Sequence, residues 1–204
     1  MRELFGGAEG KLLPRDEYRE DFERRFWRSG RSGFWKLERL QHFEEPGNDS
    51  WNAFDEGDWD RSLALLEERG PALRTHYAKI ANAGFETSRV RIVEHPLTDY
   101  LRWELHLLLA RDQLGGHTRI LPVREIARFE EKNPLPELVT LGDDVMYEIL
   151  YDENGRLRGG VLYTGTSPVV RCREFIKRLY EKAEPISTYF TREVESLGPP
   201  LRSR

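Results

Sequence analysis

The spacing of hydrophobic residues changes from a period of two to a helical period midway along the chain. Residues 89–93 alternate arginine with valine or isoleucine, which is typical of a strand, and leucines then recur three or four positions apart over residues 97–108. Pro96 predicts the start of this helix, because its backbone angle is already helical and it has no N–H that needs a partner. Thr98 and Asp99 supply oxygen acceptors for the first-turn amides. The pattern predicts a strand leading into a central helix that is buried on more than one side.

The residues before this unit predict mostly helical structure with one strand. Residues 16–30 have helical spacing, with acidic residues at the start and basic ones at the end, as the helix dipole favours. Residues 34–43 alternate, which predicts a half-buried strand with Lys36 and Glu38 on its polar face. Residues 59–84 keep one apolar stripe across a Gly-Pro step, so we expect a single helix that is kinked at the proline.

The residues after the central helix predict further strands and a last helix. Short apolar runs at 119–123 and 138–141 are expected to be strands. A hairpin is expected between strands at 145–151 and 157–163, because the intervening Asn154-Gly155 suits a two-residue type I′ turn. That register gives two cross-strand pairs, Glu148 with Val161 and Glu153 with Arg156. Both faces of the first hairpin strand are apolar, so it should lie inside a sheet that is covered on both sides.

These elements together predict an α/β fold, a mixed β-sheet with helices on both faces, preceded by a helical N-terminal part. A helix capped by Ser167 and stopped by Pro185 completes the sheet-helix core. The chain length suits one domain. The expected boundaries are a mobile lead-in at 1–14, a single domain at 15–197 (15–84 mostly helical, 85–197 the sheet-helix core) and a tail at 198–204.

Composition narrows the function classes. The net charge of −4 disfavours sequence-independent binding of nucleic acid. A single cysteine, Cys172, excludes a disulfide framework and favours the reducing cytoplasm. Its position on a helical core stripe indicates an inert buried thiol. No apolar run approaches the roughly 20 residues of a membrane span. We therefore expect a cytoplasmic protein that binds neither membrane nor, directly, nucleic acid.

The polar residues around the central helix are the candidate site. The start of a helix attracts anions through its free amides and its dipole. The candidate ligand- or anion-binding residues are Arg91, His95, Thr98, Asp99, Tyr100 and Glu104. The alternative is a capped turn with polar residues at the surface. Glu104, Arg102 and His106 would have perturbed pKa values if the helix buries them, although structural ion pairs perturb pKa values as well.

Metal and cofactor chemistry is not indicated. The histidines have no metal-ligand spacing, and a zinc site needs three or four ligands that converge. The glycine pairs at 115–116 and 159–160 lack a P-loop or dinucleotide pattern. We expect neither a metal nor a cofactor.

Several segments read above resemble an uncharacterised family of actinobacterial proteins, common in streptomycetes, that carries a domain of unknown function. The resemblance rests on the segments Phe34-Trp35-Lys36-Leu37-Glu38 and 89–105, the hairpin and the last helix, and it covers residues 26–190. No activity is established for the family. Its members often accompany helix-turn-helix regulators, so the resemblance implies a regulatory role and a protein partner, such as a transcription regulator.

A strand, a Gly-Asp step, a hairpin and a helix are also similar to the phospholipase-D-like domains of some transcription regulators. Catalytic members carry a histidine, a lysine and an aspartate that enter this strand. With Asp143 as the aspartate, Leu138 occupies the lysine position and Pro136 the histidine position. The likeness therefore implies a catalytically silent version that does not cleave phosphodiesters.

We expect a non-catalytic regulatory or interaction protein that partners a helix-turn-helix-type regulator, and a homodimer is left open. The alternative is a phosphate- or nucleotide-directed enzyme that uses Arg91, His95 and Glu104. A deep pocket where these residues converge with Tyr100 would favour the enzyme. A flat apolar patch would favour the protein partner.

Overall fold

The computed structural model describes residues 7–131 and 133–200 and contains an eight-stranded mixed sheet. The strands follow the order β1-β7-β6-β5-β2-β3-β4-β8. Their bounds are β1 Lys11–Pro14, β2 Phe34–Glu38, β3 Thr87–Val93, β4 Thr118–Pro122, β5 Glu137–Leu141, β6 Val145–Tyr151, β7 Leu157–Thr164 and β8 Glu184–Pro185. Among these strands, the β2–β3 and β3–β4 pairs are parallel and the remaining pairs are antiparallel.

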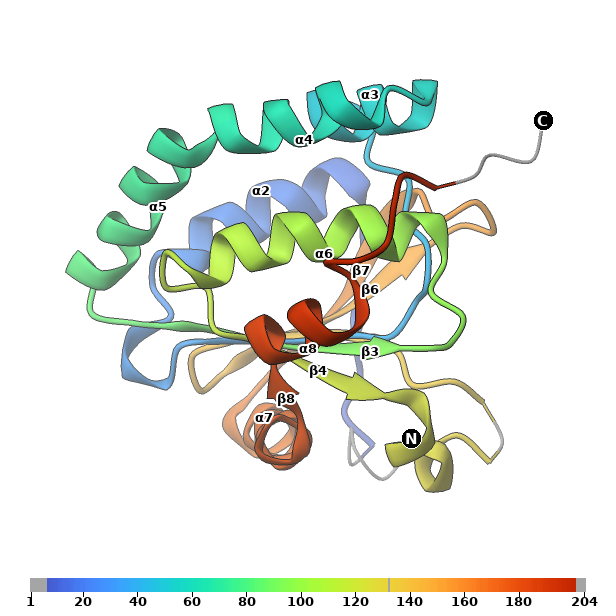
Figure 1. The fold of residues 1–204 in the computed structure, drawn as a ribbon. Coiled ribbons are helices and arrows are strands. Elements are labelled where there is room, and N and C mark those ends of the chain that lie inside the picture. The colour runs from blue at the N-terminus through green and yellow to red at the C-terminus, as the bar shows by residue number, and fades with distance from the viewer. Residues whose placement is uncertain (1–6, 132, 201–204) are drawn as a thin grey trace.

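Helices lie on both faces of this sheet, as the sequence predicts (Figure 1). The α-helices are α2 Arg15–Phe26, α3 Asp49–Glu56, α4 Trp59–Glu68, α5 Gly70–Asn82, α6 Asp99–Asp112, α7 Thr166–Lys182 and α8 Ile186–Glu193, and the short 3₁₀ turns are η1 Gly30–Ser32, η2 Val123–Glu125 and η3 Ala127–Phe129. Among the helices in the described part of the chain, none combines the length and apolar character needed to cross a bilayer.

Helix α7 covers one face of the sheet and builds the largest apolar cluster. Its side chains Val169, Cys172 and Ile176 are fully buried against inward residues of the central strands, such as Leu37 and Val90. Burial raises the pKa of the Cys172 thiol to about 12. This face of the sheet is therefore covered by apolar side chains of α7.

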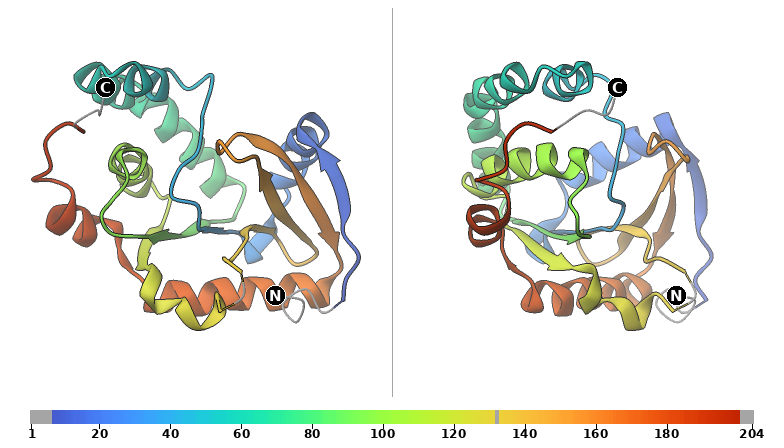
Figure 2. Two further views of the ribbon diagram at one scale, coloured as in Figure 1. Left: turned by 90° about the vertical axis from the view of Figure 1, so that its right-hand side faces the viewer. Right: turned by 45° about the vertical axis from the view of Figure 1, so that its right-hand side comes forward.

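The opposite face carries α2, α6 and α8, with a second layer of helices above them (Figures 1 and 2). Leu101 and Leu105 of α6 pack on the sheet side, together with α8. Trp103 and Leu107 pack outward against α3 and α4. The prediction that this helix is buried on more than one side is confirmed.

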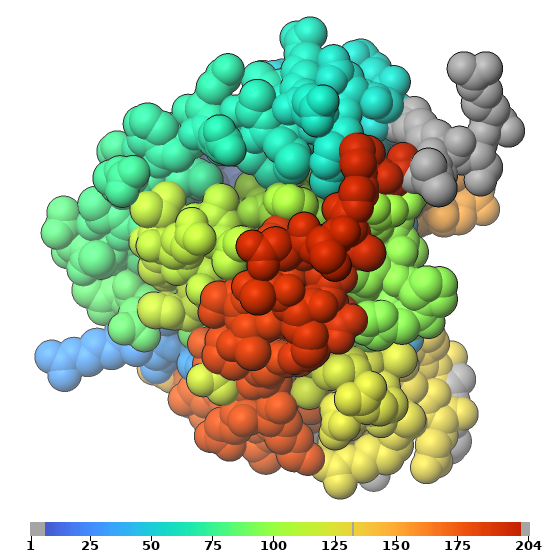
Figure 3. All heavy atoms as spheres, in the orientation of Figure 1, coloured from blue at the N-terminus to red at the C-terminus, as the bar shows by residue number. Residues whose placement is uncertain are grey.

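The residues after α8 continue across α6, and Arg102 of α6 donates a hydrogen bond to the carbonyl oxygen of Gly198. In the space-filling view, the segment from α8 to residue 200 lies over the front of α6 and reaches toward α3 (Figure 3). This segment is therefore a third neighbour of α6, beside α8 on the sheet side and the layer of α3 and α4.

Two helical predictions differ from the structure. The expected single helix over 59–84 is wrong: α4 and α5 are separate and meet at Arg69, because Pro71 has no N–H to continue the first helix. Pro96 does not begin α6 but precedes it by three residues, in a cis peptide bond with His95. Thr98 caps the helix, as expected, and its hydroxyl accepts a hydrogen bond from the Leu101 amide at 3.1 Å.

Two strand predictions also differ. Lys11–Pro14 form the edge strand β1, where the sequence predicts an unstructured lead-in; residues 1–6 of that segment lie outside the described residues. The hairpin pairs Glu148 with Val161, as predicted, but a bulge between Leu150 and Tyr151 shifts the end of the register. The Gly155 amide bonds to the Asp152 carbonyl at 3.0 Å, which gives a longer turn with Gly155 in the left-handed region instead of the type I′ turn.

Candidate functional site

The alternation of β2 and β3 places charged side chains under α6. The parallel register sets Lys36 beside Arg89 and Glu38 beside Arg91. Neighbours along a strand point to opposite faces of the sheet. The apolar residues that alternate with these charged ones therefore face α7, and the charged residues face α6. The polar face of β2, which the sequence predicts to be half-buried, lies at the centre of the molecule.

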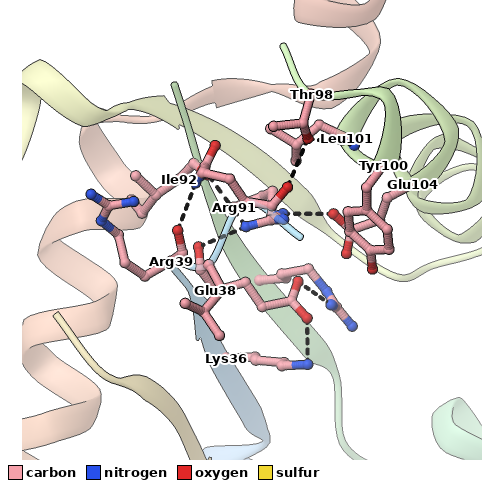
Figure 4. Close-up of polar contacts among 12 residues, drawn as sticks. Lys36, Glu38, Arg39, Arg91, Ile92, Thr98, Tyr100, Leu101 and Glu104 are labelled. Atoms are coloured by element: carbon pink, nitrogen blue, oxygen red, sulfur yellow. Dashed lines mark hydrogen bonds and ion pairs between the residues drawn. The ribbon is translucent and has the colours of Figure 1, made fainter. Parts of the chain in front are cut away.

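Glu38 is the hub of these charges. Its carboxylate is 3% exposed and forms ion pairs with both Lys36 and Arg89 (Figure 4). Burial alone would raise the pKa of Glu38, but the positive charges of Arg89, Lys36 and Arg91 outweigh it and hold the pKa well below its usual range. Two cations share one carboxylate, so this trio carries a net positive charge.

Arg91 and Glu104 form a second buried ion pair, at 2.7 Å between Nε and Oε2. The Arg91 guanidinium is fully buried and also donates to the carbonyl oxygens of Glu38 at 3.4 Å and Ile92 at 3.3 Å (Figure 4). Its remaining Nη2 has no hydrogen-bond partner among the described residues. Burial raises the pKa of Glu104, and the charge of Arg91 opposes that rise.

Glu137 of β5 is the third buried carboxylate on this face. One of its oxygens accepts hydrogen bonds from the amides of Arg39 and Leu40, at 2.5 and 2.6 Å. Burial, with a further contribution from the charge of Glu38, raises the pKa of Glu137 to about 7. This carboxyl group therefore titrates near neutral pH.

A cleft opens above these charges, between α2 and α6 and beneath α4 and α5. Its polar compartment encloses about 840 Å³ and includes Glu38 and Glu104 in its lining. Its aromatic compartment encloses about 660 Å³, and its lining includes ring side chains of α2 and α5. Both volumes are in the range typical of small-molecule sites.

Four residues line both compartments, and all four are cations: Lys36, Arg69, Arg89 and Arg111. We call this set the cationic junction. Lys36 and Arg89 share Glu38, whereas neither Arg69 nor Arg111 forms a salt bridge with any residue that the structure describes. The junction is therefore a concentration of positive charge in the middle of the cleft.

Three of the residues predicted from sequence come together beside this cleft. Arg91 pairs with Glu104, and the Tyr100 hydroxyl donates to Glu45 at 2.8 Å. Burial raises the pKa of Tyr100, and the charge of Glu104 adds to it. Arg91 and Glu104 are bonded to each other, whereas Tyr100 is bonded to Glu45 and influences the other two only through its charge interactions.

The other three predicted residues lie apart from these. The His95 ring is exposed and its Nε2 lies 3.1 Å from the Tyr189 hydroxyl of α8. Thr98 is occupied as the helix cap and donates to the Gln41 carbonyl oxygen at 2.7 Å. Asp99 is exposed and lies 3.6 Å from Arg102. The geometry at the start of α6 is that of a capped turn, and an anion site there remains a prediction.

Sequence reasoning missed Lys36, Arg89, Arg69 and Arg111 as site residues. The first two carry a signal that could have been used: two alternating charged strands predict a charged stripe if they pair in register. Arg69 and Arg111 carry no such local signal, because only the fold brings the ends of α4 and α6 over the sheet.

The other residues singled out from the sequence lie away from the cleft charges. Leu138 is buried against α7, and Asp143 is exposed and bonded to Ser32 and Arg173. His106 is half-buried between the rings of Trp59 and Phe190, and burial lowers its pKa. Within the two described ranges, no cluster of three or more His, Cys, Asp or Glu side chains is arranged to hold a metal ion.

A family model described as Domain of unknown function (DUF6879) matches residues 20–191, which include the cleft floor, all four junction residues and most of the fold. No curated protein and no solved structure matches the chain.

Proposed function

Since the chain belongs to the family described as Domain of unknown function (DUF6879), whose description states no activity, we propose a function from the cleft itself. We infer that this protein binds a small anionic molecule in the cleft without transforming it. The observation that carries the proposal is the cationic junction, where the lining shared by both compartments consists of four cations and no acid.

The chemistry of the junction fits a phosphate or a similar oxyanion. An arginine guanidinium offers paired N–H donors that match two oxygens of such a group. Arg69 and Arg111 can each offer such paired donors, because neither forms a salt bridge with a described residue. Lys36 and Arg89 add positive charge, since together they outnumber the one carboxylate of Glu38 that they share. The cleft excludes part of the solvent, so these attractions are stronger there than at an open surface.

The acids of the floor support binding over catalysis. Glu38 is held ionised by two cations and has a lowered pKa, which makes it a poor general base at neutral pH. Glu104 is bound to Arg91. A ligand-binding protein also suits the regulatory role that the sequence resemblance implies, with the ligand as the signal and a helix-turn-helix-type regulator as the partner.

Calorimetric titration of the full-length chain with pyrophosphate tests the proposal. We expect binding that weakens with salt, since exposed charges are screened beyond about 8 Å at physiological ionic strength. Arg111→Gln should reduce the affinity about tenfold or more, the usual size for a lost hydrogen bond to a charged group. Arg178 is exposed on α7, on the far side of the sheet, so Arg178→Gln is the matched control and should bind as the wild type does.

Three results would overturn the proposal: no measurable binding, equal losses in the two variants, or backbone amide shifts on titration that centre on Leu97 to Tyr100. The last of these would place the anion at the start of α6, as the sequence predicts, rather than at the junction.

A further inference from the structure

The aromatic compartment gathers rings from two helices and a flanking residue. Phe22 and Phe26 come from α2, Trp27 directly follows it, and His76 and Tyr77 come from α5. All five are partly or fully exposed although they lie in a hollow of the protein. Phe26 and His76 are nearly parallel, at 6.1 Å between ring centroids, so rings from the two helices already meet across the compartment.

A polar group without a partner lies in the same compartment. Thr87 of β3 is 8% exposed and contributes to the lining, yet its hydroxyl has no hydrogen-bond partner within residues 7–131 and 133–200. Buried hydroxyl groups in folded proteins are nearly always bonded. A ligand with a polar atom that reached this hydroxyl would supply the missing partner.

Charge orients such a ligand. The cationic junction lies at one end of the aromatic compartment, and Glu23 is the single acid among the described residues that line it. An anionic group would therefore be held at the junction, with the rest of the molecule between α2 and α5.

We propose that the aromatic compartment binds the planar heteroaromatic ring of a nucleoside phosphate, whose phosphate group lies at the cationic junction and whose ring is hydrogen-bonded by Thr87. This inference rests on the proposed function and names the ligand class of the same cleft. Aromatic side chains stack on the flat face of a base, and such stacking is worth about 1–3 kcal/mol per base in other proteins. An alkyl phosphate would satisfy the junction but would offer Thr87 no polar atom.

The test measures affinities of the full-length chain for the four ribonucleoside 5′-monophosphates, ribose 5-phosphate, hexyl phosphate and adenosine. We expect at least one nucleotide to bind about tenfold or more tightly than both ribose 5-phosphate and hexyl phosphate, as the stacking contribution implies. Adenosine, which lacks the anion, should bind more weakly than adenosine 5′-monophosphate.

Thr87→Val separates the hydroxyl from the shape of the site. Valine has the same shape, and it removes a buried group that has no partner, so the variant should unfold at the same urea concentration as the wild type or a higher one. Its affinity for the preferred nucleotide should fall several-fold, while its affinity for ribose 5-phosphate stays unchanged.

The outcomes distinguish this inference from the proposed function. Equal binding of nucleotides, ribose 5-phosphate and hexyl phosphate would overturn the ring site and leave the anion site standing. An unchanged nucleotide affinity in Thr87→Val would remove the role of the hydroxyl and with it the inference as stated. Failure of every phosphate to bind would overturn both.

Discussion

Strands β2 and β3 present two very different surfaces to the two sides of the sheet. Toward α7, residues such as Leu37, Val90 and Ile92 are fully buried in a continuous apolar cluster. Toward α6, their neighbours in sequence are Lys36, Glu38, Arg89 and Arg91, which are bonded to one another and to Glu104. The same two strands therefore contribute to an apolar core on one side and to a charged surface on the other.

The difference between the two faces bears on the proposed function. Apolar packing stabilises a fold, whereas removing charges from water costs several kcal/mol per ion, which the pairing repays only in part. Well-packed hydrophobic residues would often serve stability as well or better. The charges on the α6 side coincide with the cleft and the cationic junction, as the proposed ligand binding requires.

The largest effect is expected from breaking the buried pair on the charged face. Glu104→Leu leaves the fully buried Arg91 without its carboxylate and should lower the free energy of unfolding by about 3–5 kcal/mol. The double variant Arg91→Met/Glu104→Leu should recover most of that loss, because no unpaired charge remains. Urea denaturation measures both. A double variant as unstable as the single one would show that the two side chains are needed for something other than their mutual charge.

A slightly smaller loss is expected on the apolar face. Ile176→Ala removes a fully buried side chain of α7 and should cost about 2–5 kcal/mol, against about 0.5–1.5 kcal/mol for Ile176→Val. Pyrophosphate affinity, measured under conditions where both variants are folded, should match that of the wild type. A clear change in affinity would mean that the two faces are coupled, and the contrast between them would no longer hold.

An intermediate, pH-dependent effect is expected at Glu137. Its pKa is about 7 in the folded protein against a usual 4.5, so its contribution to stability is full below pH 4.5 and is lost as the pH rises through 7. Glu137→Gln mimics the protonated form and keeps an oxygen for the amides of Arg39 and Leu40. It should match the wild type near pH 4.5 and exceed it by about 2–3 kcal/mol at pH 8. Parallel stability profiles from pH 4.5 to 8 would contradict this assignment.

The smallest effect on stability is expected at the cationic junction. Arg111 forms no salt bridge with a described residue, and its position in the last turn of α6 favours the helix dipole only slightly. Arg111→Gln should therefore change the free energy of unfolding by less than about 1 kcal/mol, although it weakens pyrophosphate binding. A large loss of stability would place Arg111 among the structural charges instead.

Much of the fold could be predicted from local patterns. The unit from β3 to α6, the central position of β6 and the buried stripe of α7 follow from periodicity, because hydrophobic spacing reports which side of an element faces the core. The four-residue strand β1 could not be found in this way, since it is too short to establish a period and is defined by its pairing with β7.

The candidate site was predictable only in part. Arg91, Tyr100 and Glu104 are close in space because strand and helix periods bring them to one side of a βα unit. Alternation also shows that Lys36 and Glu38 share a face, but it cannot show that α4 and α5 roof that face. The junction brings together residues that lie between positions 36 and 111, on β2, β3, α6 and the joint between α4 and α5, and no local rule supplies that arrangement.

The helices above the cleft also belong to the connection between β2 and β3, the two strands that carry its charged residues. Residues 39–86, which include α3, α4 and α5, join β2 to its parallel neighbour β3. The two strands can align only after this long segment has closed its loop, a slow step in folding because the entropy of closure precedes the contacts that repay it. A chain in which β2 and β3 have not yet paired therefore has no complete cleft.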